Sequence, residues 1–300
     1  MSSTIWPDGL LTALVTPLRN DQLDLDALAE LIERQISGGV DGLVVGGGTG
    51  EFGSLTLIER RALAEGAVAA AAGRVPVIVQ TGSLATRDTI GLTEHAQSIG
   101  AHGALVASPF GEPINWSERY GFYDSVNASV DLPIMLYNTP PAGVLTFSQI
   151  EQLAALSNVS AIKDTSGDPG LLGDLVTNDQ HGLQVYVGMD TLVFDAITSR
   201  ASGVIFGVPN FIPDILASLV GRLKRRDLTD DTFELWRELR TFLRFMEVSP
   251  NYMSLCKAGC AIEGIDVGDV RAPYLMPSQP ERAELARRLA TLRTAYELLD

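Results

Sequence analysis

The feature that most constrains the fold of this chain is a repeated switch in its hydrophobic period. Short apolar runs rich in β-branched residues alternate with amphipathic stretches that are long enough to be crossover helices. The eight strand-like runs span residues 10–17, 42–47, 75–82, 103–109, 132–138, 159–164, 183–188 and 203–208. The amphipathic stretches between them include residues 25–37, 57–72, 87–99 and 147–157. Strands this apolar, joined by helices, predict a parallel sheet that helices cover on both faces.

Eight strand–helix units in succession predict an α/β fold of the (β/α)₈ TIM-barrel type. We expect the barrel to occupy residues 1–212. The rest of the chain, residues 213–300, predicts a C-terminal helical extension, with helical patterns at 213–226, 230–247, 252–262 and 280–298. No stretch rich in Gly, Pro or Ser separates the two parts, so we expect the extension to pack on the barrel as a single structural unit.

An open, doubly wound sheet is the structural alternative, because one segment matches a dinucleotide-binding motif. The segment from Gly48 to Gly53 has the G-x-G-x-x-G pattern and follows a predicted strand. The next strand ends in Gln80-Thr81-Gly82, however, and provides no acidic residue for a ribose hydroxyl. Glycines here also fit a tight turn, or a row of free backbone N–H groups that binds a carboxylate. A NAD-linked oxidoreductase is therefore the last of the functions that we consider.

The charge of the chain argues against nucleic acid as a partner. Its formal net charge is −15 and its isoelectric point is near 4.6, whereas binding to phosphates needs clustered Lys and Arg. No uninterrupted apolar run reaches the roughly 18 residues of a spanning helix, and the N-terminus lacks the pattern of a secretory leader. We therefore expect no membrane partner and a cytoplasmic location.

The cysteines and histidines do not have the spacing of a metal site. Cys256 and Cys260 stand four apart in a helical pattern, where a mutual disulfide is awkward and burial as small apolar residues is expected. His95, His102 and His181 also lack the spacing of metal ligands. The sequence therefore predicts no metal.

Two residues stand at neighbouring strand ends, where a barrel of this type carries its chemistry. Lys163 ends the sixth predicted strand and Tyr137 ends the fifth. Neighbouring strands are about 4.8 Å apart, so the two side chains are expected to meet over one small molecule. The chain has only three lysines against nineteen arginines, so a lysine in an apolar run is unusual for it.

An amine beside a phenol has a definite chemical use. An amine among apolar walls loses the hydration that stabilises its ammonium form, and the neutral amine forms a Schiff base with a ketone. A neighbouring phenol shuttles protons, while Thr49 can hydrogen-bond either the phenol or a substrate carboxylate. The alternative for Lys163 is a buried ion pair with Asp190 or Glu51, because structural ion pairs also perturb ionisation.

Several other polar residues near the strand ends are candidate site residues, and three of them have a second interpretation. Four of them are candidates to contact substrate hydroxyls: Glu112, Thr165, Asp190 and Asn210. Thr165 and Asn210 also stand just before predicted helices, where capping is the expected single role. Glu51 is either an acid of the barrel lumen or a first-turn glutamate that complements a helix N-terminus.

Five motifs in order resemble the N-acetylneuraminate lyase and dihydrodipicolinate synthase superfamily across nearly the whole chain. They are GGGTGEF (46–52), SPF (108–110), YNTP (137–140), IKDTSGD (162–168) and GVIFGVPN (203–210). The resemblance implies a class I aldolase in which Lys163 forms the Schiff base, with Tyr137 and Thr49 as catalytic partners. It implies a substrate site for a 2-oxo acid such as pyruvate, made by Gly48, Thr49, Thr165, Gly188 and Ile205. It also implies a homotetramer, as a dimer of dimers, with no metal or organic cofactor beyond the covalent imine.

The sequence departs from the synthase branch of the superfamily at three places. It has Gly48-Thr49 where that branch has two threonines, and Phe110-Gly111 where it has a second tyrosine, so the usual relay of three hydroxyls is incomplete. After Tyr-Asn-x-Pro the synthase has an arginine for the carboxylate of its aldehyde partner, but this chain continues as Pro141-Ala142-Gly143. The GGTGEF variant instead resembles sequences that act on 2-keto-3-deoxy sugar acids.

The resulting prediction is a Schiff-base lyase that cleaves a 2-keto-3-deoxy sugar acid to pyruvate and an aldehyde. One alternative is a dehydratase of such acids that uses the same lysine, like 5-dehydro-4-deoxyglucarate dehydratase. A second is 4-hydroxy-tetrahydrodipicolinate synthase, which the missing arginine disfavours. A third is a homologue that binds pyruvate without catalysis, because the relay hydroxyls are missing.

Overall fold

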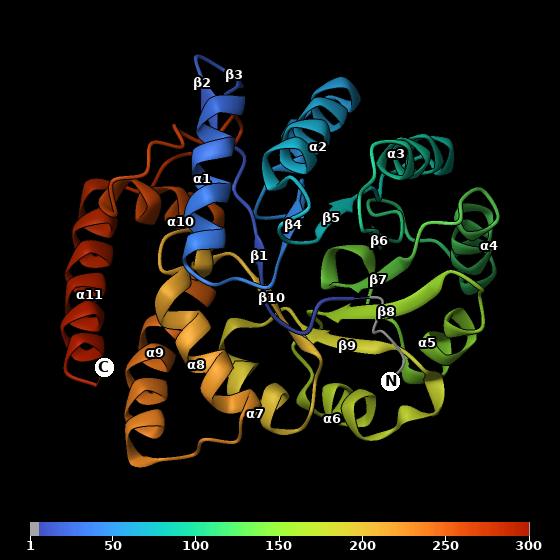
Figure 1. Cartoon of the computed structure of the whole chain (residues 1–300). Coiled ribbons are helices and arrows are strands. Elements are labelled where there is room, and N and C mark those ends of the chain that lie inside the picture. Colours follow the sequence, from blue (N-terminus) through green and yellow to red (C-terminus); the bar gives the residue numbers. More distant parts are fainter. Residues whose placement is uncertain (1–5, 300) are drawn as a thin grey trace.

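A computed structural model describes residues 6–299 and shows eight parallel strands closed into a barrel (Figure 1). The strands are β1 (Gly9–Ala13), β4 (Gly42–Val45), β5 (Val77–Gln80), β6 (Gly103–Ala107), β7 (Ile134–Asn138), β8 (Val159–Asp164), β9 (Gln184–Val187) and β10 (Gly203–Phe206). Each strand pairs with its neighbours in chain order, and β10 pairs with β1. The (β/α)₈ prediction is confirmed, and the open-sheet alternative is wrong because the barrel has no free edge.

A ring of helices covers the outside of the barrel (Figure 1). It consists of α1 (Leu25–Ser37), α2 (Leu57–Ala71), α3 (Thr86–Ser98), α4 (Trp116–Asn127), α5 (Phe147–Ala154), α6 (Pro169–Thr177), α7 (Val193–Thr198) and α8 (Pro213–Lys224). Local sequence fixes several of their starts. Thr56, Asn115 and Thr146 begin α2, α4 and α5 with reciprocal capping boxes, which satisfy backbone N–H groups that a helix leaves free.

The C-terminal helices α9 (Asp230–Glu247), α10 (Tyr252–Ile262) and α11 (Gln279–Glu297) lie together beside α8 on one side of the barrel (Figure 1). The helical extension is confirmed, although α8 contacts β1 and α7 and so completes the outer ring. The boundary at residue 212 stays a prediction. A short hairpin, β2 (Leu18–Arg19) with β3 (Gln22–Leu23), was not predicted from the sequence. None of the helices described within residues 6–299 is long and apolar enough to span a membrane.

Successive side chains along each strand point alternately into the barrel lumen and towards the helices. This alternation determines the direction of each side chain at the barrel ends. One buried cluster fills the lumen with Leu11, Val44, Ile78, Leu105, Met135, Ala161, Tyr186 and Ile205, and Tyr137 packs against it. A larger cluster lies between the strands and the helices. Because Lys163 is two residues beyond Ala161, the period of a strand directs it into the lumen, as it does Tyr137 beyond Met135.

Candidate active site

Tyr137 and Lys163 are register partners at the C-terminal ends of β7 and β8. The Lys163 Nζ lies 4.6 Å from the centroid of the Tyr137 ring, and Lys163 is only 7% exposed. The sequence therefore correctly predicts that an amine and a phenol meet at the mouth of the barrel. A lysine side chain over the face of a phenol ring is a favourable arrangement, and it keeps the amine close to the ring.

Lys163 is not the partner of a buried carboxylate. Among residues 6–299 it forms no ion pair, and Glu51 binds Lys257 instead, with 2.7 Å between Oε1 and Nζ. Asp190 is near enough for Lys163 to lower its pKa, but the two do not form an ion pair within the described chain. The ion-pair interpretation of Lys163 is therefore wrong, and its amine is available to a ligand.

Gly188 and Thr165 flank the stem of this lysine. A Cβ atom built on Gly188 would lie 2.7 Å from Lys163 Cε and would collide with Thr165 Oγ1, so only glycine fits at Gly188 without displacing a neighbour. Thr165 Oγ1 is buried and has no hydrogen-bond partner in the structure. A buried hydroxyl without a partner is costly, and a bound oxygen atom above Lys163 would satisfy it.

The glycine-rich loop approaches the mouth from the other side, after β4. Nothing lies within 4 Å of a Cβ built on Gly48, so the space beside its backbone is open. Thr49 contacts the end of β10, since a Cβ on Gly207 would lie 2.8 Å from Thr49 Cγ2. Within the described chain no hydrogen bond joins Thr49 to Tyr137. Ile205 is fully buried in the lumen cluster, two residues before Gly207.

Asp190 and Tyr252 form a hydrogen-bonded pair near this mouth. The Tyr252 hydroxyl donates to Asp190 Oδ2 at 2.7 Å and accepts from the Gly207 backbone N–H at 2.8 Å. Burial raises the pKa of Asp190 to about 8, and the nearby Glu247 carboxylate acts in the same direction, against Tyr252 and Lys163. Burial and Asp190 together raise the pKa of the Tyr252 phenol well above its usual value. The raised pKa of Asp190 favours its protonated form.

Sequence reasoning missed two residues of this region, Tyr252 and Lys257, both on α10. The rarity of lysine in the chain was a usable signal for Lys257, whereas Tyr252 has no signal in the sequence pattern. Lys257 is fully buried, and its Nζ also donates to the Asp269 backbone oxygen at 2.8 Å. Helix α10 thus contributes polar side chains to the mouth of the barrel.

The capping interpretations of Thr165 and Asn210 are wrong. Helix α6 has Asp168 as its N-cap, and α8 has Ile212, so neither predicted residue occupies a cap position. Asn210 instead joins β1 to the end of β10, accepting from Val15 N and donating to the Ala13 and Gly207 carbonyl oxygens. The side-chain amide of Asn210 therefore connects these two segments of backbone.

A guanidinium from the outer ring reaches the loop after β7. Arg119, in the first turn of α4, donates from Nη1 to the Gly143 carbonyl oxygen at 3.0 Å. Its Nε is buried and has no partner. The loop itself carries Pro141-Ala142-Gly143 and no arginine, so the positive charge at this place comes from a different element. Glu112, in the preceding loop, is exposed.

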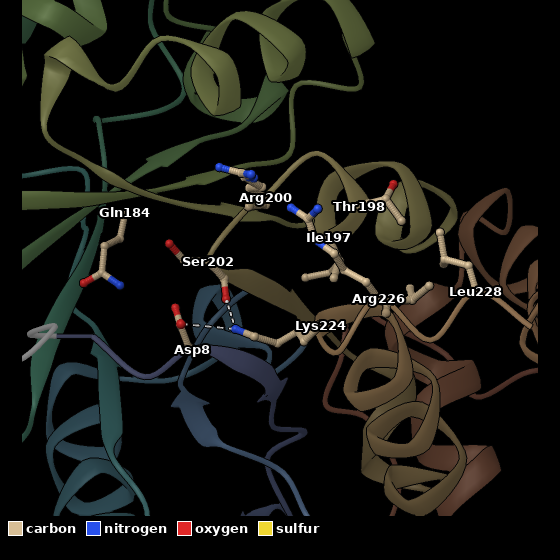
Figure 2. A pocket seen from close by; sticks show the side chains of 11 residues that line it. Asp8, Gln184, Ile197, Thr198, Arg200, Ser202, Lys224, Arg226 and Leu228 are labelled. Carbon is tan, nitrogen blue, oxygen red and sulfur yellow. Dashed lines mark hydrogen bonds and ion pairs between the residues drawn. The ribbon is translucent and has the colours of Figure 1, made fainter.

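The hollow in Figure 2 lies at the opposite end of the barrel. Its volume is about 560 Å³, and it is lined by residues at the N-terminal ends of β1, β9 and β10, among them Asp8, Gln184 and Ser202. Lys224 lies 3.2 Å from both Asp8 Oδ2 and the Ser202 carbonyl oxygen, while Arg200 and Arg226 follow the C-termini of α7 and α8 (Figure 2). Helix dipoles favour cations there, so the basic character of this hollow has a structural cause.

The described residues hold no cluster of three His, Cys, Asp or Glu side chains able to bind a metal ion. Cys256 and Cys260 are both buried free thiols, as expected from the sequence.

A (β/α)₈ barrel with an amine and a phenol at adjacent strand ends defines a barrel enzyme, because such enzymes react at this face. A sequence model of the Dihydrodipicolinate synthetase family matches residues 7–292. The chain therefore belongs to this family, and it is a lyase of the family's type, acting on a carbon–carbon or a carbon–oxygen bond. The resemblance found in the five sequence motifs is confirmed.

Relatives and solved structures agree over nearly the whole chain. The 4-hydroxy-tetrahydrodipicolinate synthase of Syntrophus aciditrophicus is 34% identical over 287 residues, which are 93% of this chain and 96% of the relative. The structure of YagE from E. coli K12 in complex with pyruvate has a TM-score of 0.90 and 29% identity, and covers 95% of this chain and 98% of its own. The structure of the chloride-inhibited dihydrodipicolinate synthase of Acinetobacter baumannii complexed with pyruvate has a TM-score of 0.90 and 25% identity. The match covers 96% of this chain and 99% of that chain.

Proposed function

We propose that this lyase forms a Schiff base between Lys163 and the ketone of pyruvate or a pyruvate-containing acid. The observation that carries the proposal is the buried amine of Lys163, which lies beside the Tyr137 ring and forms no ion pair within residues 6–299. A cation held for stability would have a carboxylate partner, since burying a charge without one is costly. A nucleophilic amine needs the opposite, an apolar wall and an open side for the carbonyl carbon.

The proposed chemistry follows from these positions. The neutral amine adds to the C2 carbonyl, and the carbinolamine loses water to give an iminium. The iminium withdraws electrons from the C3–C4 bond, which breaks as the C4 hydroxyl loses its proton and an aldehyde leaves. The enamine that remains takes a proton at C3, and water then releases pyruvate. Tyr137 is the group that donates and accepts protons in these steps, as the nearest phenol.

We assign the carboxylate of the 2-oxo acid to the Gly48–Thr49 loop, with Thr165 as a further contact. The open space beside Gly48 supports this assignment, as does the unpartnered Thr165 Oγ1 next to the lysine. We place Gly188 and Ile205 at the edge of the same space. Gly188 leaves room there because it has no side chain, and Ile205 contributes an apolar surface. The proposal needs no organic cofactor, because the imine itself is the electron sink.

The proposed substrate is a 2-keto-3-deoxy sugar acid, cleaved to pyruvate and an aldehyde. Support comes from the GGTGEF variant of the loop and from the absence of an arginine after Tyr-Asn-Thr-Pro. A second candidate, 4-hydroxy-tetrahydrodipicolinate synthase, is supported by relatives that carry this name at about one-third identity. Arg119 at Gly143 adds to the second candidate, because it brings a guanidinium to the loop that lacks the usual one. We further propose a homotetramer, as in the superfamily.

The deciding experiment is reductive trapping with pyruvate and borohydride, followed by peptide mapping. The proposal requires an adduct of pyruvate on the peptide that contains Lys163, and a protein that stays unmodified at saturating pyruvate contradicts it. The two substrate classes separate in one assay: pyruvate release from keto-deoxy sugar acids, against condensation of pyruvate with a carboxylate-bearing aldehyde. Loss of water from the sugar acid without release of an aldehyde would identify the dehydratase instead.

A further inference from the structure

A fully buried ion pair connects the glycine-rich loop to the C-terminal extension. Glu51 Oε1 lies 2.7 Å from Lys257 Nζ, and both side chains are 0% exposed. Glu51 ends the loop that contains Gly48 and Thr49. Its backbone has a φ of 57°, a left-handed conformation that residues other than glycine rarely adopt. The loop therefore has a strained residue at its end, and the carboxylate of that residue is anchored outside the loop.

Further hydrogen bonds from the extension reach the same two side chains. The Arg271 backbone N–H donates to Glu51 Oε2 at 2.8 Å, and Lys257 Nζ also donates to the Asp269 carbonyl oxygen at 2.8 Å. Burial lowers the pKa of Lys257, and Glu51 opposes that shift. Helix α10 and the segment after it thus hold Glu51 from two directions, whereas no described residue outside its chain neighbours lies within 4 Å of a Cβ built on Gly48.

We infer that Glu51 and Lys257 are positioning residues that hold the Gly48–Thr49 backbone in the conformation that receives a substrate carboxylate. This inference rests on the proposed function for the identity of the ligand, but the effect on the loop does not. Backbone N–H groups bind an anion only when they converge, and a chain rich in glycine does not keep such a conformation by itself. A fixed residue at the end of the loop removes that freedom.

A role in stability alone does not explain this pair. Burying two charges costs as much desolvation as their attraction returns, and well-packed apolar residues of similar size often stabilise a protein equally well. The Glu51 carboxylate does something that an apolar side chain cannot do, because the Lys257 Nζ lies 2.7 Å from Oε1 while the Arg271 N–H donates to Oε2. Strain in a residue next to a binding loop is commonly retained where it orients the loop.

The test separates positioning from stability by removing one charge and then both. Lys257→Met leaves Glu51 unpaired, so we expect a lower melting temperature and weaker pyruvate binding. Glu51→Gln combined with Lys257→Met leaves no buried charge, so we expect the melting temperature to recover in large part. We expect pyruvate binding of the double variant, measured by borohydride trapping, to stay weaker by roughly tenfold, because the anchor is still missing. Lys224→Met is the matched control, since it removes a lysine far from the loop.

Hydrogen exchange of the peptide that contains residues 46–52 measures the loop without any ligand. We expect faster exchange there in both variants, with unchanged exchange in β7 and β8. Glu51→Asp keeps both charges but shortens the anchor, and it should give the same pattern if the double variant does not fold. Recovery of pyruvate binding and of loop exchange together with the melting temperature would overturn the inference. A wild-type protein that forms no pyruvate adduct would overturn the proposed function, while loop exchange would still decide the positioning role.

Discussion

Lys163 and Tyr137 occupy equivalent positions on β8 and β7, and the lysine amine lies over the face of the tyrosine ring, 4.6 Å from its centroid. The first prediction concerns the amine. Lys163→Arg keeps the positive charge but cannot add to a ketone, so we expect no borohydride-trapped adduct and a loss of turnover of at least roughly 10³-fold. Mass spectrometry of the trapped protein checks the adduct. An arginine variant that still turns over substrate at the wild-type rate would contradict the assignment.

The second prediction concerns the phenol. Tyr137→Phe keeps the ring beneath Lys163 and removes only the hydroxyl. We expect a folded protein whose turnover falls by about 10²- to 10⁴-fold, the usual range for a lost acid–base group. Steady-state kinetics measure this, with the melting temperature as the control for folding. Equal turnover in the variant and the wild type would remove Tyr137 from the proton transfers.

The third prediction uses the space at Gly188. A methyl group there would collide with Thr165 Oγ1 and lie 2.7 Å from Lys163 Cε, so Gly188→Ala has to displace the side chains beside the amine. We expect adduct formation to slow by roughly tenfold or more, since small misplacements of reacting atoms are costly. Gly173→Ala is the matched control, because nothing lies within 4 Å of a Cβ at that position in α6. A similar loss in both variants would mean that the effect is not steric.

The fourth prediction is a pH dependence caused by Asp190. Its pKa is raised to about 8 in the folded protein from an ordinary value of 3.8. Between pH 3.8 and pH 8 the folded state therefore holds a proton that the unfolded state has lost. The contribution of Asp190 to the free energy of unfolding is therefore greatest below pH 4 and declines as the pH rises towards 8. The slope is at most about 1.4 kcal/mol per pH unit.

Asp190→Asn removes this proton equilibrium and should flatten the decline in stability between pH 4 and 8 relative to the wild type. Urea unfolding at a series of pH values measures it. Glu247, Tyr252, Lys163 and Cys256 surround the carboxyl group and remain in the variant. Tyr252→Phe removes a hydrogen bond that lowers the pKa of Asp190, so the transition should move to higher pH. Parallel curves for the wild type and Asp190→Asn would contradict the protonated state.

Much of the fold and the centre of the site could be predicted, because both depend on local periodicity. A period of two places alternate strand residues in the lumen, so Lys163 and Tyr137 were expected to face each other once the barrel was recognised. Tyr252 could not be predicted, and for Lys257 the rarity of lysine was a signal that did not reveal its partner. They lie on a helix far along the chain, and their place depends on how the extension packs on the barrel, which no hydrophobic pattern encodes. Thr165 and Asn210 were misjudged for a related reason, since both contact residues from other strands.

The buried link between Glu51 and the extension has a consequence for how this protein is made. The carboxylate of Glu51 has its partners 206 and 220 residues later in the chain, at Lys257 and Arg271. Contacts of such long sequence separation form late, because the intervening chain must be synthesised and ordered first. The contacts that hold the glycine-rich loop are therefore completed only after residue 271 has left the ribosome. A chain that ends before these partners would carry the Lys163 amine without the loop geometry that we propose for substrate binding.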